Sequence, residues 1–260
     1  MRKKDVSRRL VGDYRALNRL TIPNKYPRLL ISELLDNTRG GKWFTRLHLK
    51  NGFNLTRVEA GPEWKTGFRT KKGLFEYTVM PFGLTNAPAT FQEVMDTIFQ
   101  DEEPCVWHMD DILIYGGSTE AEHQAFVDKV LQQYVKQELA VNLTKSEFHL
   151  HETTFLGHNV HDSQVLMDPA KPKTMSKWPV PTKKNEVQAF LGFANHYDRF
   201  IEKHSAKARP LIDLTKDVQF SCGDQQQQEF YELRTRFLSA PILTQFDRTL
   251  ETIMETDASP

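Results

Sequence analysis

Residues 105–115, Cys-Val-Trp-His-Met-Asp-Asp-Ile-Leu-Ile-Tyr, decide how the rest of the chain is interpreted. Two apolar runs, residues 106–109 and 112–115, flank Asp110 and Asp111. Their β-branched and aromatic content predicts two short strands. Because two polar residues stand between these strands, the sequence predicts a tight hairpin with the two aspartates at its turn.

The aspartate pair is open to two interpretations. In the first, Asp110 and Asp111 form a solvated turn, because aspartate is a common turn residue. In the second, the adjacent carboxylates hold divalent metal, because Mg²⁺ prefers oxygen ligands and nucleotidyl transfer commonly uses two ions bridged by carboxylates. The pair alone does not decide between them, and the surrounding sequence must.

The composition describes a folded chain of 260 residues, enough for one large domain or two to three small ones. An apolar fraction of 39% supplies a core and argues against intrinsic disorder. Two isolated cysteines, Cys105 and Cys222, fit a reducing compartment. The N-terminus is charged, and no apolar run approaches the ~18 residues of a membrane span. We therefore expect neither secretion nor a membrane partner.

Positive charge gathers in two zones, although the whole chain balances 34 basic against 34 acidic residues. Residues 1–28 carry nine Lys or Arg against two Asp, a net charge of +7. Residues 171–216 carry ten against four acidic residues, a net charge of +6. Two basic zones around a neutral middle could bracket a polyanion, and ordinary solvated faces explain them equally well.

Hydrophobic periodicity predicts alternating helices and strands through residue 160, and hence an α+β fold with a mostly antiparallel sheet. In the strand at residues 43–49, His48 lies on the face opposite to Leu47 and Leu49. Beyond residue 165, Pro179 and Pro181 separate helices of a basic helical subdomain. Further strands are expected at residues 55–58, 64–69, 75–79, 147–150, 154–160 and 252–256, and helices at 31–35, 87–99, 120–135 and 224–238, with Ser32, Asn86 and Thr119 as N-caps.

Residues 80–92, Met-Pro-Phe-Gly-Leu-Thr-Asn-Ala-Pro-Ala-Thr-Phe-Gln, resemble the reverse transcriptases of gypsy-type LTR retrotransposons (Metaviridae), and most of all the fungal copies. The resemblance covers nearly the whole chain, and so many motifs in the same order make it specific. It favours the metal-site interpretation of the aspartate pair. The other matching stretches are residues 13–18, 68–70, 110–115, 155–157, 190–195 and 255–259.

The resemblance implies a right-hand polymerase, with fingers and palm in residues 1–160 and a thumb in 161–216. Residues 217–260 would form a connection and the first strand of a truncated RNase H domain, so RNase H activity is expected to be absent. The implied reaction is RNA-directed DNA polymerisation with two Mg²⁺ or Mn²⁺ ions. Its partners would be an RNA template, a DNA primer and dNTPs, in the cytoplasm (within a virus-like particle) or the nucleus. Dimerisation is left open.

The resemblance also implies roles for individual residues. Asp110 and Asp111 match the metal-binding pair of the palm. The residues expected at the incoming nucleotide are Lys3, Lys4, Arg9, Phe53 as the steric gate, Phe82, Gly83 and Met109. Leu156 and Gly157 match the primer grip, and Lys183, Lys184, Lys203 and Lys207 are expected along the phosphate backbone of the duplex.

The chain departs from the family pattern at His48, where the related palm strand carries a third metal-binding aspartate. A neutral imidazole is a poor ligand for Mg²⁺ and a fair one for Zn²⁺ or Mn²⁺. We therefore expect a polymerase by descent whose catalysis is impaired. Two alternatives stay open: a non-catalytic module that binds primer–template, and a structural subunit that pairs with an active polymerase.

Overall fold

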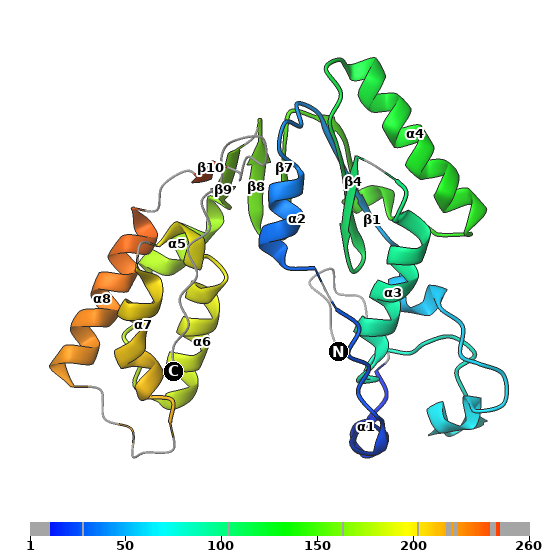
Figure 1. Cartoon of the computed structure of the whole chain (residues 1–260). Coiled ribbons are helices and arrows are strands. Elements are labelled where there is room, and N and C mark those ends of the chain that lie inside the picture. The colour runs from blue at the N-terminus through cyan, green and yellow to red at the C-terminus, as the bar shows by residue number, and fades with distance from the viewer. Residues whose placement is uncertain are drawn as a thin grey trace, which may run out of the picture. The chain divides into compact units, whose positions relative to one another are not determined.

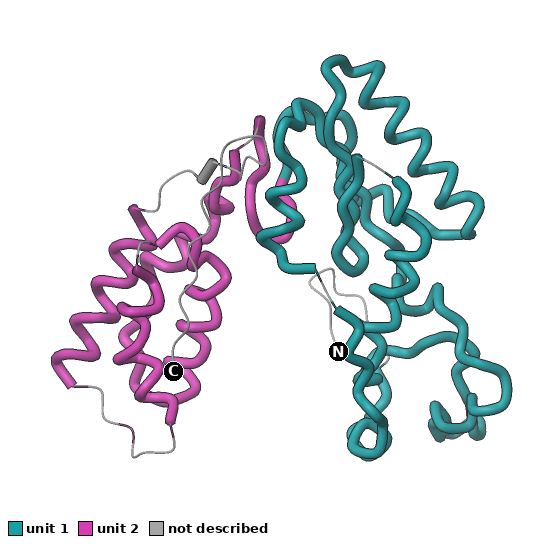
Figure 2. The backbone as a smooth tube through the Cα atoms, viewed as in Figure 1, with its two compact units in different colours: residues 1–153 teal, residues 154–260 magenta. Residues whose placement is uncertain are grey.

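The computed structural model describes residues 11–27, 29–102, 104–162, 164–201, 203–216, 220, 223–239 and 243–244. The chain divides into two compact units, residues 1–153 and 154–260 (Figures 1 and 2). Helices alternate with antiparallel strands along the described chain, which confirms the predicted α+β class. The subdomain boundaries inferred at residues 160 and 216 stay predictions. Lys3, Lys4, Arg9 and the strand expected at residues 252–256 lie outside the described residues.

Unit 1 is organised on a four-stranded sheet in the order β4-β5-β1-β6. Its strands are β1 (Phe44–His48), β4 (Cys105–His108), β5 (Asp111–Tyr115) and β6 (Glu147–Leu150). The pairing of β5 with β4 and with β1 is antiparallel, as is that of β1 with β6. Alternate residues of each strand point to the same side, and the face that carries Leu47, Ile112 and Ile114 is buried in the main core of the unit.

Two long helices, α3 (Ala87–Phe99) and α4 (Glu120–Lys136), cover the buried face. Phe91, Met95 and Phe99 recur at helical spacing on α3 and are fully buried, as the periodicity predicts. They join an apolar core with residues of β1, β5 and α4. Burial of this core is the main favourable term in folding unit 1.

The other elements of unit 1 are short. Residues 64–69, expected as one strand, divide instead between a 3₁₀ turn and the first strand of a hairpin. This hairpin pairs Phe68–Thr70 with Gly73–Phe75, so the strand expected at residues 75–79 is wrong beyond Phe75. These elements are α1 (Arg15–Leu20), α2 (Ile31–Asn37), the 3₁₀ turns Gly52–Leu55, Glu63–Thr66 and Leu143–Lys145, and the strands β2 (Phe68–Thr70) and β3 (Gly73–Phe75).

The strand expected at residues 55–58 is wrong. Asn51, at a φ of 57°, instead starts the 3₁₀ turn Gly52–Leu55, and only Arg57 forms an isolated bridge, with Val79. The 3₁₀ turn is favoured over a strand because it brings both Phe53 and Leu55 against the apolar core. Tertiary packing thus overrides a local strand preference.

Of the three expected helix caps, Thr119 caps α4 by accepting the N–H of Glu122, Asn86 holds the N-cap position of α3 without a capping bond, and the prediction for Ser32 is wrong. The N-cap of α2 is Leu30, so Ser32 lies inside that helix. Asn86 precedes α3, but its side chain accepts the N–H of Asn24 and donates to the carbonyl of Ile22, both at 2.9 Å. Its amide therefore ties the extended segment before α2 to the body of unit 1.

Unit 2 contains helices that pack on one another and most of a second sheet, whose order is β10-β9-β8-β7. The helical core closes on aromatic contacts such as Phe190 with Phe230, whose ring centroids lie 4.6 Å apart. Among the described helices, none is long and apolar enough to cross a bilayer. The strands are β7 (Glu152–Phe155), β8 (His158–His161), β9 (Gln164–Met167) and β10 (Leu243–Thr244), and the helices are α5 (Ala170–Ser176), α6 (Lys184–Asn195), α7 (His204–Asp213) and α8 (Asp224–Leu238).

A buried polar network joins β1 to α4 and β6. Thr45 is fully buried, and its hydroxyl lies 2.8 Å from Nε2 of His123 and accepts the N–H of His149 at 3.1 Å. His123 is also fully buried, and Nδ1 of its ring lies 3.0 Å from the carbonyl of Gly116. Burial lowers the pKa of His123, which favours the neutral ring that such a network needs.

We predict that Thr45→Val lowers the free energy of unfolding by about 2–4 kcal/mol. The valine keeps the shape of the side chain but leaves the His149 N–H and Nε2 of His123 without a partner in a buried site. Urea denaturation measures the loss. The matched control is Thr97→Val on the exposed side of α3, which should stay within about 0.5 kcal/mol of the parent. An equal effect of both substitutions would contradict this role of Thr45.

Candidate functional site

The β4–β5 hairpin presents the two aspartates differently from the sequence prediction. His108 pairs with Asp111, so the turn residues are Met109 and Asp110 and Asp111 belongs to β5. Met109 has a φ of 56°, which suits the first central residue of a tight hairpin turn but is uncommon for a bulky side chain. The pairing register of β4 with β5, and not the polarity of the residues, therefore determines which two residues form the turn.

The register between β1 and β5 places His48 directly opposite Asp111, as expected for that strand. Backbone bonds hold this end of β1 on both sides. The N–H of Leu49 donates to the carbonyl of Asp110 at 2.7 Å, and the carbonyl of His48 accepts the N–H of Asn142 at 2.8 Å. The backbone of His48 is therefore held opposite the hairpin that carries the two carboxylates.

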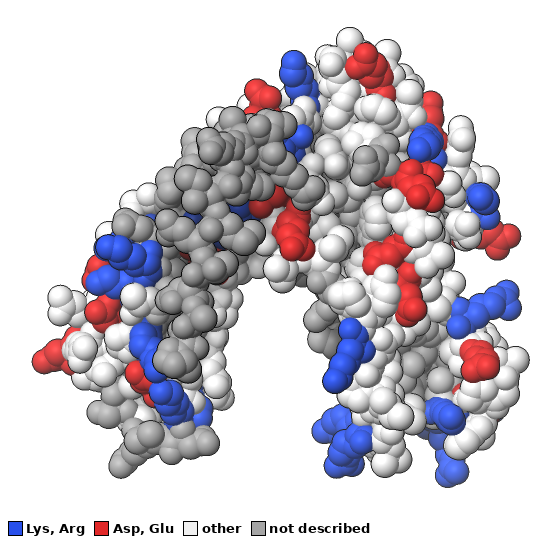
Figure 3. All heavy atoms as spheres, viewed as in Figure 1, with Lys and Arg blue, Asp and Glu red and all other residues white. Residues whose placement is uncertain are grey.

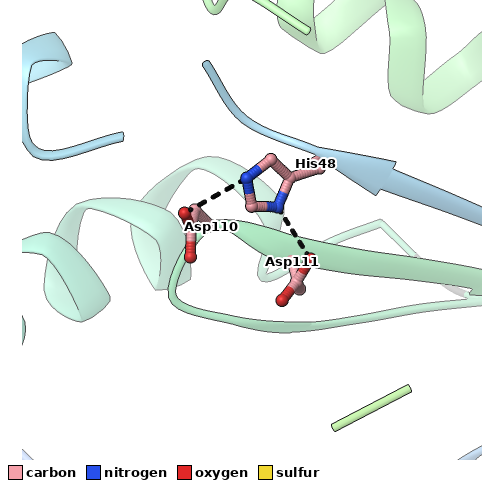
Figure 4. A group of neighbouring side chains, drawn as sticks. All are labelled: His48, Asp110 and Asp111. Carbon is pink, nitrogen blue, oxygen red and sulfur yellow. Dashed lines mark hydrogen bonds and ion pairs between the residues drawn. The ribbon is translucent and has the colours of Figure 1, made fainter. Parts of the chain in front are cut away.

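His48, Asp110 and Asp111 form one cluster (Figure 4). Nδ1 of His48 lies 2.9 Å from Oδ1 of Asp111, and Nε2 lies 3.5 Å from Oδ2 of Asp110. The imidazole is 19% exposed, and the carboxyl groups of Asp110 and Asp111 are 46% and 38% exposed. The cluster is a set of metal-ligating groups open to solvent on one side.

A pocket of about 390 Å³ opens beside this cluster. Phe53 lines it, and its ring centroid lies 5.3 Å from that of Phe82 and 5.4 Å from that of Phe91. Gly52 allows this packing, because a Cβ there would stand 3.0 Å from the ring of Phe91. The residues that line the pocket are His48, Leu49, Lys50, Asn51, Gly52, Phe53, Phe82, Phe91, Met109, Asp110, Asn142 and Lys145.

Three polar residues of this pocket, Lys50, Asn142 and Lys145, were missed by sequence reasoning. The N–H of Lys50 donates to the carbonyl of Ala140 at 2.7 Å, and this contact brings the segment after α4 to the end of β1. Nothing local in residues 140–145 signals that contact. Tertiary pairing alone adds two lysines and an amide to the wall of the pocket.

Gly83, expected at the nucleotide site, lies in a tightly held loop, although Phe82 but not Gly83 lines the pocket. Its φ is 105°, and a Cβ there would stand 3.2 Å from the carbonyl of Gly12. The Asn18 side chain donates to the carbonyl of Gly83 at 2.8 Å and accepts the N–H of Thr85 at 2.9 Å. Glycine is therefore needed for the backbone conformation of this loop.

Leu156 and Gly157 form a turn between β7 and β8 with φ values of 50° and 82°. Side chains that follow α6 hold this turn. The Leu156 carbonyl lies 3.0 Å from Nε2 of His196 and 3.1 Å from Nδ1 of His158, and the Gly157 carbonyl accepts the Tyr197 hydroxyl at 2.9 Å. Three side chains thus fix two carbonyls of the turn.

His158 is buried within this group, at 4% exposed. Its ring stacks on Phe200 with centroids 5.7 Å apart and also contacts the rings of His196 and Tyr197. Burial, with a smaller contribution from the nearby His196, lowers the pKa of His158 to about 4. The folded state therefore favours the neutral ring.

The four lysines expected along a phosphate backbone differ in what they contact. Lys183 is exposed just before α6, and Lys203 is exposed just before α7. Lys184 is half-buried at the start of α6. Nζ of Lys207 lies 2.9 Å from a carboxylate oxygen of Glu232 in α8, so its charge is paired within unit 2. In unit 1, lysine and arginine side chains gather at the end that carries α1 and the β2–β3 hairpin (Figure 3).

Comparison with known families gives a match over residues 1–160 to reverse transcriptase (RNA-dependent DNA polymerase). Two curated relatives are the Tf2-3 and Tf2-7 transposon polyproteins of Schizosaccharomyces pombe, 38% and 37% identical over 260 residues. These alignments cover 99% of this chain and 19% of each polyprotein. The chain therefore spans about a fifth of the length of these relatives.

Solved structures agree with this match. A foamy viral protease-reverse transcriptase in complex with double-stranded DNA is 25% identical, with a TM-score of 0.85 over 95% of this chain and 44% of that one. The corresponding complex with an RNA/DNA hybrid is 23% identical, with a TM-score of 0.80 over 90% of this chain and 32% of that one. The second likeness bears on the fold alone.

We predict that His158 makes unit 2 sensitive to acid. The unfolded ring takes up its proton near pH 6.5 and the folded ring near pH 4, so the stabilisation is complete above pH 6.5 and is lost as the pH falls toward 4. The loss should approach about 3 kcal/mol. Thermal melts of the parent and of His158→Gln between pH 7 and 4 measure it.

The glutamine variant should show a flatter dependence of melting temperature on pH, since its side chain does not titrate. His161→Gln, at an exposed position of β8, is the matched control and should follow the parent. Parallel pH profiles for His158→Gln and the parent would show that this ring does not carry the acid sensitivity.

Proposed function

This chain belongs to the reverse transcriptase (RNA-dependent DNA polymerase) family, and we propose that it is the polymerase part of a gypsy-type retrotransposon polyprotein, catalytically impaired by His48. Its fold is that of a right-hand polymerase. One observation carries the proposed impairment. The side chain of His48, opposite Asp111 across β1 and β5, occupies the place from which a third carboxylate would face the same metal.

The substrate we propose is a deoxynucleoside triphosphate bound in the pocket beside the cluster. Phe53 would crowd the sugar 2′ position and exclude ribonucleotides. Phe82, with its ring centroid 5.3 Å from that of Phe53, would form the floor of the pocket, with Gly83 holding the loop behind it. Met109 would lie against the newly formed base pair. Lys3, Lys4 and Arg9, which lie outside the described residues, would bind the triphosphate through charge-assisted bonds.

The partner we propose is a primer–template duplex. The Leu156–Gly157 turn would hold the primer end, because its backbone is fixed by His158, His196 and Tyr197. Lys183, Lys184 and Lys203 would contact phosphates without regard to sequence, which makes binding depend strongly on salt. Lys207, paired with Glu232, would contribute through the shape of unit 2 more than through its own charge.

The donor set only partly fits the magnesium ions that this family's chemistry calls for. Asp110 and Asp111 supply hard carboxylate oxygens, as Mg²⁺ requires. His48 supplies no oxygen, and its Nδ1 lies 2.9 Å from a carboxylate oxygen of Asp111 that a metal would otherwise use. When bound, the two ions would stabilise the charge that develops during nucleotidyl transfer. The imidazole therefore weakens that site in two ways.

The His48–Asp111 contact also favours a second candidate function. A chain that keeps the pocket and the basic helices but lacks a complete metal site would act as a non-catalytic module that binds primer–template. Salt-dependent binding of an RNA/DNA duplex without primer extension would support it. Failure to bind duplex even at low salt would exclude it.

We predict that His48→Asp raises primer extension by about 10³–10⁴-fold. The added carboxylate supplies the missing oxygen ligand, and a stabilisation of the transition state by about 4–6 kcal/mol corresponds to that factor. The measurement is extension of oligo(dT) on poly(rA) with Mg²⁺ and, separately, with Mn²⁺.

His48→Asn is the matched control, because it has nearly the same size as aspartate but no charge, and it should not restore extension. Equal extension by the parent and His48→Asp would contradict the proposed impairment. If neither extends, the proposal of a binding module gains.

We predict further that Phe53→Val, made in the His48→Asp background, relaxes the exclusion of ribonucleotides by roughly 10–200-fold, about 1–3 kcal/mol. The smaller side chain leaves space at the sugar 2′ position. The ratio of dNTP to rNTP incorporation measures this change. Phe75→Val, on the exposed strand β3 outside the pocket, is the control and should leave the ratio unchanged. An unchanged ratio of dNTP to rNTP incorporation by Phe53→Val would show that Phe53 does not exclude ribonucleotides.

A further inference from the structure

We propose that His48 and Asp110 bind a transition-metal ion of borderline softness, represented by Zn²⁺ or Co²⁺, and that Asp111 orients His48 for this role. The proposal deepens the one above and rests on it for the place of the site in a polymerase. The new proposal differs from the proposed function because it names a different class of metal and assigns a different role to each of the three side chains.

The hydrogen-bond geometry assigns the proton of the imidazole. Nδ1 of His48 lies 2.9 Å from Oδ1 of Asp111, an ordinary N–H···O distance, whereas Nε2 lies 3.5 Å from Oδ2 of Asp110. In the neutral ring the proton therefore sits on Nδ1 and is donated to Asp111. The lone pair of Nε2 is left facing Asp110.

The separation of these two donors suits a tetrahedral ion. With metal–ligand bonds of about 2.0–2.2 Å, two donors of a tetrahedral shell lie roughly 3.3–3.5 Å apart. Neighbouring donors of an octahedral Mg²⁺ shell, with bonds of about 2.0–2.1 Å, lie roughly 2.9 Å apart. The observed 3.5 Å between Nε2 of His48 and Oδ2 of Asp110 agrees with the first arrangement.

The chemistry of the donors points the same way. Imidazole nitrogen is a preferred ligand of Zn²⁺, Co²⁺ and related ions, while Mg²⁺ selects oxygen. His48 and Asp110 both line the pocket, so water can complete the coordination shell there. Catalytic zinc sites likewise combine imidazole and carboxylate ligands with a coordination position that is open to water.

Asp111 has a distinct part in this arrangement. A carboxylate that accepts the second N–H of a metal-binding histidine fixes the ring and raises its basicity. The backbone pairing of His48 with Asp111 across β1 and β5 keeps this contact in place. Asp111 thus changes from a metal ligand in the related polymerases to an orienting residue here.

The test is a titration of the whole chain with Co²⁺, followed by visible absorption, since a tetrahedral Co²⁺ shell absorbs far more strongly than an octahedral one. The parent should develop the strong tetrahedral bands. Equimolar Zn²⁺ should remove them, and a hundredfold excess of Mg²⁺ should not. His48→Asp should lose the bands, and Asp111→Asn should weaken Co²⁺ binding about 10–100-fold.

Two controls separate the site from adventitious binding. His161→Ala, which removes an exposed imidazole of β8, should bind Co²⁺ like the parent. His48→Ala should bind it at least tenfold more weakly, with circular dichroism confirming an unchanged fold. Equal Co²⁺ binding by the parent and His48→Ala, or weak octahedral bands in the parent, would overturn the proposal.

The outcomes for the two proposals are distinct. Primer extension by His48→Asp together with an absence of tetrahedral bands in the parent would refute the metal assignment alone. Tetrahedral bands in the parent that depend on His48 would support the metal assignment even where His48→Asp fails to extend a primer, a failure that counts against the proposed impairment alone.

Discussion

The antiparallel pairing of β1 with β5 is the constraint on which the site depends. It places His48 opposite Asp111 and Leu47 opposite Ile112, so one face of the strand pair joins the core while the other carries the polar cluster. Because side chains alternate along a strand, a slip of one residue would bury the imidazole and expose the leucine. The core and the cluster therefore enforce the same register, and the position of the imidazole is as well determined as that of the core.

Two turns are held in a backbone conformation that is uncommon for residues with large side chains. Met109 in unit 1 and Leu156 in unit 2 have φ values of 56° and 50°. Contacts from distant segments compensate. The Leu49 N–H bonds the carbonyl of Asp110, and His196 reaches the carbonyl of Leu156. Strain of this kind persists only where the surrounding structure over-determines it, which is common at sites that bind ligands.

An imidazole where the resemblance implies a carboxylate would alter the chemistry of the site without altering the fold. His48 removes one negative charge from the family's ligand set, and its ring engages one carboxylate as a hydrogen-bond acceptor while facing the other with a lone pair. Hard and borderline metals respond to such a change in opposite directions. As proposed above, the same residue would weaken a magnesium site and would supply a donor pair for another metal. The right-hand polymerase fold supports either chemistry, so function has to be argued from the site.

The sequence by itself determined the α+β class, the long helices α3, α4 and α8, and the β4–β5 hairpin. These features follow from periodic burial and from strand pairing close in the chain, which local patterns express well. The family match bears out the resemblance carried by residues 80–92 and 110–115.

Only the tertiary structure decided which two residues form the hairpin turn, where Asn86 directs its amide and how Gly52–Leu55 folds. It also decided that Lys50, Asn142 and Lys145 meet in one pocket and that His158, His196 and Tyr197 fix the Leu156–Gly157 turn. These features depend on contacts between segments tens of residues apart. Their energies come from packing and buried hydrogen bonds, which no local pattern of residues encodes.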